Sequence, residues 1–412
     1  MGFIRKIIIC GFTITALSFT AQKGVAEEVS TSPLPVSLSL KETITDTLKN
    51  NLSIAVQKYN SKIVEQSIFE KEADFDTTFD FEFALGEETR QAAGAFANPS
   101  KSRAQNYDWD FSIAQKFVTG GDYELSFDTN RSLSNSTFVG LNPQYTSDFN
   151  LSLTQPLLKD FGIDNNKREI YIAKNNQKIS DYEFKKSVID VITEAENIYW
   201  DLVFSIEDLK VKKKSLERAQ DLEKQVKAQV EVGTMAPLEV LQAQSEVASR
   251  DQLLLSAKDL ILDNEDNLKN ILNYTFDSER GQKNIRPTDA PLFDPGKEGT
   301  LDQALQAALS QRPDLLGKKK ELDNRNIEVK YNENQIYPTL DLVSSLGLNG
   351  ISGEAINITS GTVQGLSKFG GGYDKALSEL TTGKYHLWQF GLNLSYPLGN
   401  RAAKSKLTSK RL

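Results

Sequence analysis

The chain has 412 residues, 25% of them charged, and a formal net charge of −8 at pH 7. An acidic chain of this kind is a poor candidate for binding nucleic acid, which is recognised through basic surfaces. It contains a single cysteine, Cys10, in the segment that we expect to be removed, so neither disulfides nor thiol chemistry are expected in the mature chain.

The N-terminus predicts a secretory signal peptide over residues 1–26. Arg5 and Lys6 precede the apolar run 7–19, and residues 24–26 (Gly-Val-Ala) suit a cleavage site. The run is short for a bilayer span, although an uncleaved anchor helix is the alternative. No later stretch approaches the roughly 18 consecutive apolar residues of a transmembrane helix. If the mature chain enters a membrane, we expect it to do so by β-strands.

The first predicted element of the mature chain is a helix over residues 40–74, which ends in an alternating strand. The same pattern returns over residues 301–335. A constant offset of 261 without a gap aligns residues 40–83 with 301–344 and places Leu40 on Leu301. Such self-similarity predicts an internal duplication in which each copy begins with a helix and continues into a strand.

The strands that follow alternate cleanly between apolar and polar residues. Phe79, Phe81 and Phe83 share one face of the first strand, and the pattern returns from Tyr107 and again at Trp388. A soluble β-sandwich has the same period of two, but aromatic residues toward lipid and polar residues toward a lumen are typical of outer-membrane strands. Four acidic residues are candidates for the lumen face, where they would favour cations, although solvated charge explains them equally well: Asp80, Glu82, Asp108 and Asp110.

A very long helical hairpin is predicted over residues 165–273. Residues 165–232 contain neither proline nor glycine, and apolar residues recur at heptad spacing, as in Ala195, Leu202 and Leu209. The first helix would be on the order of 100 Å long. Gly233 suits the end of this helix and Pro237 the first turn of the next, so an antiparallel coiled coil is expected.

The rest of the chain predicts a second copy that stops early. Residues 281–299 form a linker rich in proline and glycine, and the second repeat covers residues 300–412, after a first repeat over 27–280. At an offset of 241, residues 149–162 match 390–400 through a strand that ends in Pro-Leu. The last residues therefore read as the start of a second long helix.

These segments together resemble the TolC family of trimeric outer-membrane efflux and secretion channels. The resemblance covers the whole mature chain and rests on the order and spacing of the duplicated helix-strand copies and of the following motifs: QRPDL (311–315), TQPLLKDFG (154–162), AENIYWDLV (195–203) and VGTMAPLEVLQAQSEV (232–247). It implies an α+β membrane protein in which antiparallel strands of several protomers build one β-barrel and helical hairpins form a periplasmic tunnel.

The resemblance also implies partners and a location. The chain is expected in the cell outer membrane, in contact with its lipid and with helices in the periplasm. It is expected to form a homotrimer that docks a periplasmic adaptor coupled to an inner-membrane pump. The function implied is a passive conduit for tripartite efflux or type I secretion. The alternative is a periplasmic coiled-coil scaffold or adaptor that does not insert.

Two features depart from the family pattern. Strands over residues 107–117 and 122–131 form an extra hairpin beyond the two strands per repeat that the family leads us to expect. This hairpin either enlarges the barrel or forms an external excursion, and the excursion is slightly favoured. By internal symmetry, on the order of a hundred residues of helical hairpin would follow Leu412, which suggests a C-terminal truncation.

The candidate functional site is the tip of the long hairpin, where exposed apolar residues at a turn are compatible with docking a partner helix. Its residues are Gly233, Thr234, Met235, Pro237 and Leu238, and an ordinary helix turn is the alternative. No catalytic, cofactor-binding or metal-binding residues are predicted, and the protein is not expected to be an enzyme. His386 has no cysteine partner, and the glycine-rich segment 369–374 lacks a phosphate-binding Lys-Ser/Thr and is expected to be a surface loop.

Overall fold

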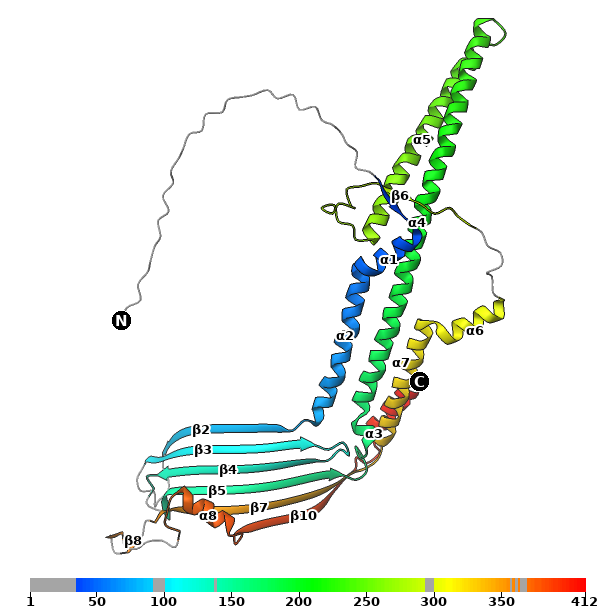
Figure 1. Ribbon diagram of the computed structural model, residues 1–412. Helices are drawn as coiled ribbons and strands as arrows, with labels where there is room; N and C mark the ends of the chain where they lie inside the picture. The colour runs from blue at the N-terminus through cyan, green and yellow to red at the C-terminus, as the bar shows by residue number, and fades with distance from the viewer. Residues whose placement is uncertain are drawn as a thin grey trace, which may run out of the picture.

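The molecule is elongated, with a helical hairpin at one end and a β-sheet at the other (Figure 1). The computed structural model describes residues 35–91, 101–136, 139–292, 300–355, 358–359, 362–363 and 369–412. The predicted signal peptide and part of the predicted linker lie outside these residues. Among the described helices, none combines the length and the apolar character needed to cross a membrane.

The predicted helix over residues 40–74 is two helices, α1 (Leu40–Asn50) and α2 (Leu52–Glu72). The chain breaks at Asn51, whose side-chain oxygen accepts hydrogen bonds from the backbone N–H groups of Ser53 (2.9 Å) and Ile54 (3.2 Å) and so caps α2. A single helix was therefore the wrong prediction here, because a capping side chain competes with helix continuation.

The second helical segment divides in the same way, into α6 (Leu301–Gln311) and α7 (Pro313–Asn334). Pro313 occupies the first turn of α7, where its missing N–H costs nothing. Both α1 and α6 begin with a capping box, formed by Ser39 with Glu42 and by Thr300 with Gln303. The first residues of α6 and α7 lie 261 positions after those of α1 and α2, as the sequence alignment predicts. The internal duplication itself stays a prediction.

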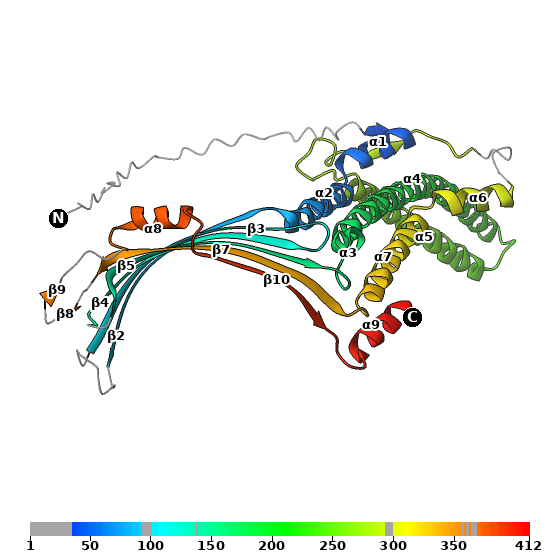
Figure 2. The ribbon, with the colours of Figure 1, turned by 90° about the horizontal axis from the view of Figure 1, so that it is seen from below.

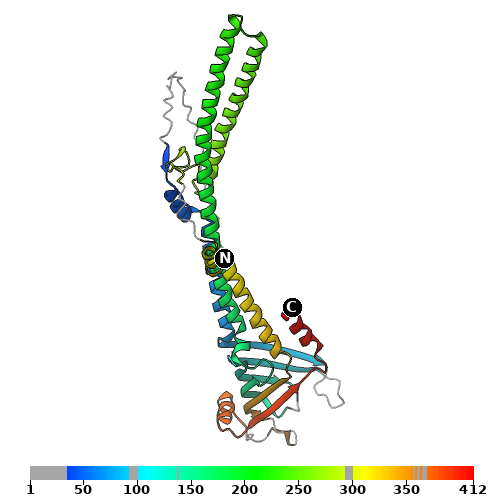
Figure 3. The same cartoon turned by 90° about the vertical axis from the view of Figure 1, so that its right-hand side faces the viewer.

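The long hairpin consists of α4 (Arg168–Glu231), preceded by the short helix α3 (Ile163–Asn166), and of α5 (Pro237–Ile271). The 64 residues of α4 make a helix about 96 Å long that runs from the sheet to the tip (Figure 3). Predicted seam residues are buried along α4, including Ala195, Leu202 and Leu216. The predicted helical hairpin is therefore present.

The main apolar core of the described residues lies where the base of the hairpin meets two short strands. Strand β1 (Val36–Leu38) pairs in parallel with β6 (Ile285–Pro287). The core consists of Leu38, Ala195, Tyr199, Leu202, Leu268, Ile271, Leu272 and Ile285. It fastens β1 and the segment after α5 to the middle of α4.

Tyr199 is fully buried in this core, and its hydroxyl is satisfied by hydrogen bonds. The hydroxyl lies 2.9 Å from Oδ2 of Asp289 and 3.2 Å from the carbonyl of Leu38, and it accepts from the backbone N–H of Asp289 (3.2 Å). The same Oδ2 accepts from the N–H of Leu40 at 2.6 Å, at the start of α1. Burial raises the pKa of the Tyr199 phenol, which stays protonated at neutral pH and can donate.

Six strands form one antiparallel sheet in the order β10-β7-β5-β4-β3-β2. Their bounds are β2 Thr78–Gln91, β3 Lys101–Lys116, β4 Asp122–Ser134, β5 Leu141–Pro156, β7 Thr339–Ala355 and β10 His386–Ser395. The hairpin predicted over residues 107–131 is β3–β4, and it lies between β2 and β5. The external excursion was thus the wrong choice, because both outer edges of the hairpin pair with neighbouring strands.

A short helix, α8 (Tyr373–Thr381), lies on the convex side of the curved sheet (Figure 2). Its Tyr373 ring contacts Trp109 and Tyr145 at centroid distances of 5.6 and 4.7 Å. A Cβ at Gly350 of β7 would lie 2.0 Å from the carbonyl oxygen of Ala376, so glycine permits this close packing. The segment 369–374 was expected to be a loop, but its last two residues already belong to α8, because Tyr373 packs against the sheet. The small strands β8 (Ile358–Thr359) and β9 (Thr362–Val363) precede it.

The last helix, α9 (Arg401–Arg411), packs beside α7 after the strand-Pro-Leu junction. The side chains of Lys410 and Arg411 form ion pairs with Glu328 and Glu333, each at 2.7 Å. Asn400 takes a left-handed conformation (φ +41°), and its Nδ2 donates to the carbonyl of Ile336 at 2.9 Å. The predicted helical start after residue 398 is therefore present.

We expect Tyr199→Phe to destabilise the base of the hairpin by about 1–3 kcal/mol, because it removes the buried hydrogen bond of the hydroxyl to the carbonyl of Leu38 and its partly buried hydrogen bonds with Asp289. Thermal and denaturant unfolding of the purified protein in detergent measure the loss. Tyr59→Phe is the matched control, because the Tyr59 side chain on α2 is exposed, and we expect no change there. Equal stability of the two variants would contradict the role given to Tyr199.

Candidate functional site

The tip of the long hairpin is a Schellman turn. Gly233 has φ +79°, in the left-handed region that favours glycine. Its N–H donates to the carbonyl of Val230 (3.0 Å), and the N–H of Thr234 donates to the carbonyl of Gln229 (2.9 Å). The Thr234 hydroxyl donates to the same carbonyl at 2.9 Å. The end of α4 is thus satisfied by hydrogen bonds within the turn and needs no partner of its own.

The side chains of the tip project apolar surface into solvent. Val232 and Leu238 are 74% and 70% exposed, and Met235 and Leu241 are also exposed. Pro237 occupies the first turn of α5, as the sequence predicts. The five predicted tip residues thus lie together at the far end of the molecule, and Val232 and Leu241 extend their apolar surface. Val232 immediately precedes Gly233, so its position at the predicted turn could have identified it.

The convex face of the sheet is apolar and aromatic. Cross-strand ring pairs join β2 to β3, with centroid distances of 4.9 Å for Phe81 with Phe111 and 5.5 Å for Phe83 with Trp109. Trp109 also contacts α8, which lies on the convex side. The apolar positions named from the sequence therefore share the convex face, since residues at spacing two point the same way.

The opposite, concave face carries the predicted acidic residues. Asp80, Glu82, Asp108 and Asp110 alternate with the aromatic residues, and Glu82 is the cross-strand partner of Asp110. Sequence reasoning missed two further carboxylates that continue this row across the sheet. Asp128 of β4 faces Asp110, and Asp148 of β5 faces Asp128. The alternation of Tyr123, Leu125 and Phe127 could have identified Asp128, since it is the next position on the other face.

Neighbouring amides and hydroxyls engage several of these carboxylates. The Nδ2 of Asn349 donates to Oδ1 of Asp148 at 2.6 Å, and the Nδ2 of Asn130 donates to Oδ1 of Asp108 at 2.5 Å. The Ser126 hydroxyl donates to Oδ2 of Asp128 at 2.9 Å. The concave face is therefore a hydrogen-bonded polar surface across four neighbouring strands.

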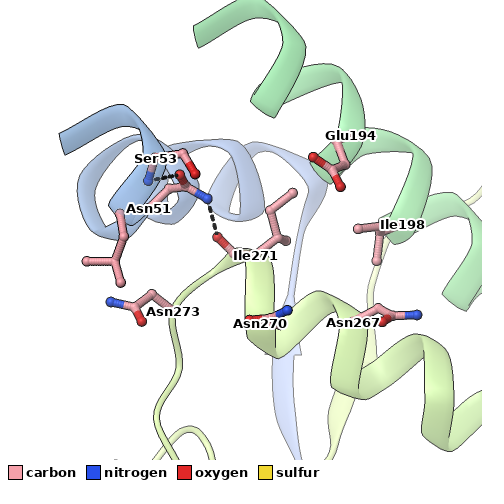
Figure 4. A pocket seen from close by; sticks show the side chains of 9 residues that line it. Asn51, Ser53, Glu194, Ile198, Asn267, Asn270, Ile271 and Asn273 are labelled. Carbon is pink, nitrogen blue, oxygen red and sulfur yellow. Dashed lines mark hydrogen bonds between the residues drawn. The ribbon is translucent and has the colours of Figure 1, made fainter. Parts of the chain in front are cut away.

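A polar cavity of about 290 Å³ lies where α1 and α2 meet the base of the hairpin (Figure 4). Its lining consists of Asn51, Leu52, Ser53, Glu194, Ile198, Asn267, Asn270, Ile271 and Asn273. Asn51 uses its oxygen to cap α2 and its Nδ2 to donate to the carbonyl of Ile271 at 3.0 Å. This side chain joins α2 to the end of α5, so the contact is structural.

The residues that the structure describes hold no group of three or more His, Cys, Asp or Glu side chains suited to a metal ion. His386 begins β10, and its Nδ1 lies 3.0 Å from the carbonyl of Gly383, so it belongs to a turn. The candidate functional regions are the apolar tip of the hairpin and the sheet, which has one apolar and one polar face.

Comparison with protein families supports the resemblance seen in the sequence. Residues 122–274 match the family described as Outer membrane efflux protein. This segment includes strands β4 and β5 and the entire long hairpin. No curated protein sequence matches the chain.

Solved structures share the fold at low sequence identity. The CmeC outer membrane channel of Campylobacter jejuni superposes with a TM-score of 0.55 at 17% identity, over 90% of this chain and 64% of its own. For the outer-membrane channel OprN the TM-score is 0.56 at 13% identity, over 90% of this chain and 67% of OprN. For the outer membrane protein VceC of Vibrio cholerae the TM-score is 0.52 at 15% identity, over 90% of this chain and 72% of VceC. The chain thus spans about 64% of the length of CmeC.

We expect Gly233→Val to destabilise the hairpin tip by about 1–2 kcal/mol, because a β-branched residue is strained at φ +79°. Open space surrounds the position, so the cost comes from the backbone alone. Gly233→Asn is the matched control, since asparagine tolerates the left-handed region. Hydrogen exchange of the amides of Gln229 to Leu241 measures the effect, and equal protection in the two variants would refute it.

Proposed function

We propose that the chain is the outer-membrane component of a tripartite efflux or type I secretion system. It serves as a passive conduit to the exterior. The match of residues 122–274 to the family described as Outer membrane efflux protein and the similarity of the fold to solved outer-membrane channels support the proposal. The observation that carries the proposal is a curved sheet with an apolar convex face, attached to a helical hairpin about 96 Å long.

The sheet supports assembly of one barrel from several copies. In the described part of the chain, β2 and β10 are the two edge strands, and they run antiparallel to each other. Unpaired strand edges are not tolerated in lipid, because backbone polar groups there have no water to bind. Pairing of β10 of one copy with β2 of the next removes both edges, and three copies give the homotrimer implied by the resemblance.

Exposure of the edge strands supports the same arrangement. Apolar side chains of β2 (Phe79, Phe81) and of β10 (Trp388, Phe390) are each more than half exposed in the single chain. Alignment of these strands in a barrel makes one continuous apolar belt toward the lipid and leaves Glu82 and Asp110 toward the lumen. The carboxylates would favour cations in the lumen.

The hairpin extends into the periplasm in this arrangement, and its tip docks a periplasmic adaptor that is coupled to an inner-membrane pump. The tip presents Val232, Met235, Leu238 and Leu241 to solvent on a turn whose backbone is already satisfied. Such a surface suits the apolar face of a partner helix. Transport is driven by the partner, and the chain itself catalyses nothing.

We expect the protein to fractionate with the outer membrane, to need detergent for extraction, and to have the mass of three chains in native mass spectrometry. The reason is the apolar belt on the convex face, which requires lipid or detergent cover. A periplasmic scaffold that does not insert would instead be released by osmotic shock without detergent. Recovery of a soluble protein or of a folded membrane monomer would overturn the proposal.

We expect Leu238→Asp to weaken adaptor binding roughly 30-fold, because it places a charge in an apolar contact worth about 2 kcal/mol. Leu238→Met is the matched control, since it keeps the site apolar. Binding of the adaptor to the purified protein gives the affinity, and membrane fractionation confirms that insertion is unchanged. If both variants bind and export like the native protein, the tip is not the docking surface.

A further inference from the structure

We propose that the barrel contains six strands from each copy, eighteen in a trimer, and that its bore admits wider hydrophilic cargo than four strands per copy would allow. The inference rests on the proposed trimeric channel and concerns the width of its outer-membrane part. The family resemblance leads to an expectation of two strands per repeat, and the β3–β4 hairpin adds two more.

The hairpin is a full member of the sheet. Strand β3 pairs with β2 from Ala114 opposite Thr78 to Lys101 opposite Gln91. On the other side, β4 pairs with β5 from Asp122 opposite Thr154 to Ser132 opposite Gln144. Both outer edges of the hairpin are therefore paired along nearly their whole length, as strands in lipid require.

The side chains of the hairpin continue both faces of the sheet without interruption. One convex row runs from Phe81 through Phe111, Phe127 and Phe149 to Leu348, across five strands. Another runs from Phe79 through Ile113, Leu125, Leu151 and Leu346 to Trp388, across all six. This register is expected of strands that belong to the barrel wall and not of a hairpin that lies outside it.

The concave face is continuous in the same way. The row Glu82, Asp110, Asp128, Asp148 and Asn349 crosses five strands with polar side chains. Two of its four carboxylates, Asp110 and Asp128, belong to the hairpin. The hairpin therefore contributes polar lining to the bore, which suits large hydrated cargo more than apolar compounds.

Strand number sets the width of the bore. With strands about 4.8 Å apart and tilted by about 40°, eighteen strands close at a backbone radius of roughly 18 Å and twelve at roughly 12 Å. Side chains of about 5 Å leave free radii of roughly 13 and 7 Å, since interior positions are filled by side chains first. The difference is large enough to separate hydrophilic polymers by size.

The test is strand counting in the native trimer by cryo-electron microscopy, together with polymer exclusion in planar bilayers. Polyethylene glycols of graded size are added on the outer side only, so that they probe the barrel and not the tunnel. We expect eighteen strands and entry of polymers of up to roughly 13 Å radius. A trimer with fewer strands, or with a cut-off near 7 Å, would overturn the wide barrel and leave the proposed channel function intact.

A variant lacking residues 101–134 tests the contribution of the hairpin directly. Excision joins β2 to β5 as neighbours, and Thr78 then faces Ser152 with the aromatic residues still on the convex face. We expect twelve strands and a cut-off near 7 Å. Asp110→Asn is the matched control, which changes charge without changing width and should keep the native cut-off. An unchanged cut-off after excision contradicts the proposal; if the variant does not assemble, the strand count of the native trimer decides.

If the native protein forms no membrane trimer at all, the proposed function fails, and the wide barrel fails with it. That outcome differs from a trimer of the wrong width, so the two conclusions are tested separately.

Discussion

The buried hydroxyl of Tyr199 holds together a region where β1, β6, α1, α4 and α5 meet. It binds Asp289, whose carboxylate also accepts from the first residue of α1, and it lies against the carboxyl end of β1. The parallel pair β1–β6 and the helices α4 and α5 enclose it. Because the hydroxyl itself is buried among apolar side chains, the loss of its hydrogen bonds is costly, and these bonds fix the start of α1 relative to the hairpin.

From this junction, α4 continues without a break in both directions. Toward the sheet it runs beside α2 and α7, and toward the tip it pairs with α5 alone (Figure 3). A polar contact between the side chains of Asn175 and Asn324, at 2.8 Å, ties α4 to α7. Near the tip, α4 and α5 are thus supported only by each other, which suits a surface that adapts to a partner.

Local signals in the sequence were sufficient to predict the helical hairpin and to predict which strand residues share a face. Gly233 and Pro237 mark the turn because only certain residues suit those backbone positions, and Phe79 to Phe83 mark a face because the strand period is two. Residues 40–74 were predicted as one helix because Asn51 interrupts no apolar pattern and its capping role depends on a side-chain orientation.

Features that depend on contacts between distant residues could not be predicted from local sequence patterns. Strands β1 and β6 are three residues each and lie roughly 250 residues apart, too short for a periodic signal. Helix α8 depends on close packing against Gly350 and Trp109 and follows a glycine-rich segment typical of a loop. The alternation in β3 and β4 predicts a hairpin but cannot say whether its outer edges are paired. The docking role of the tip, and the lumen role of the carboxylates, remain predictions.

The chain order of the sheet has a consequence for biogenesis. Strands β2 to β5 are consecutive and can form a meander early in folding, but β5 must wait for β7, which pairs with it from roughly 200 residues away. Meanwhile α4 and α5 fold through local contacts. The edge of β5 therefore stays unpaired until the segment up to β7 has been made. Contacts of such long range form late and leave time for pairing with the wrong strand.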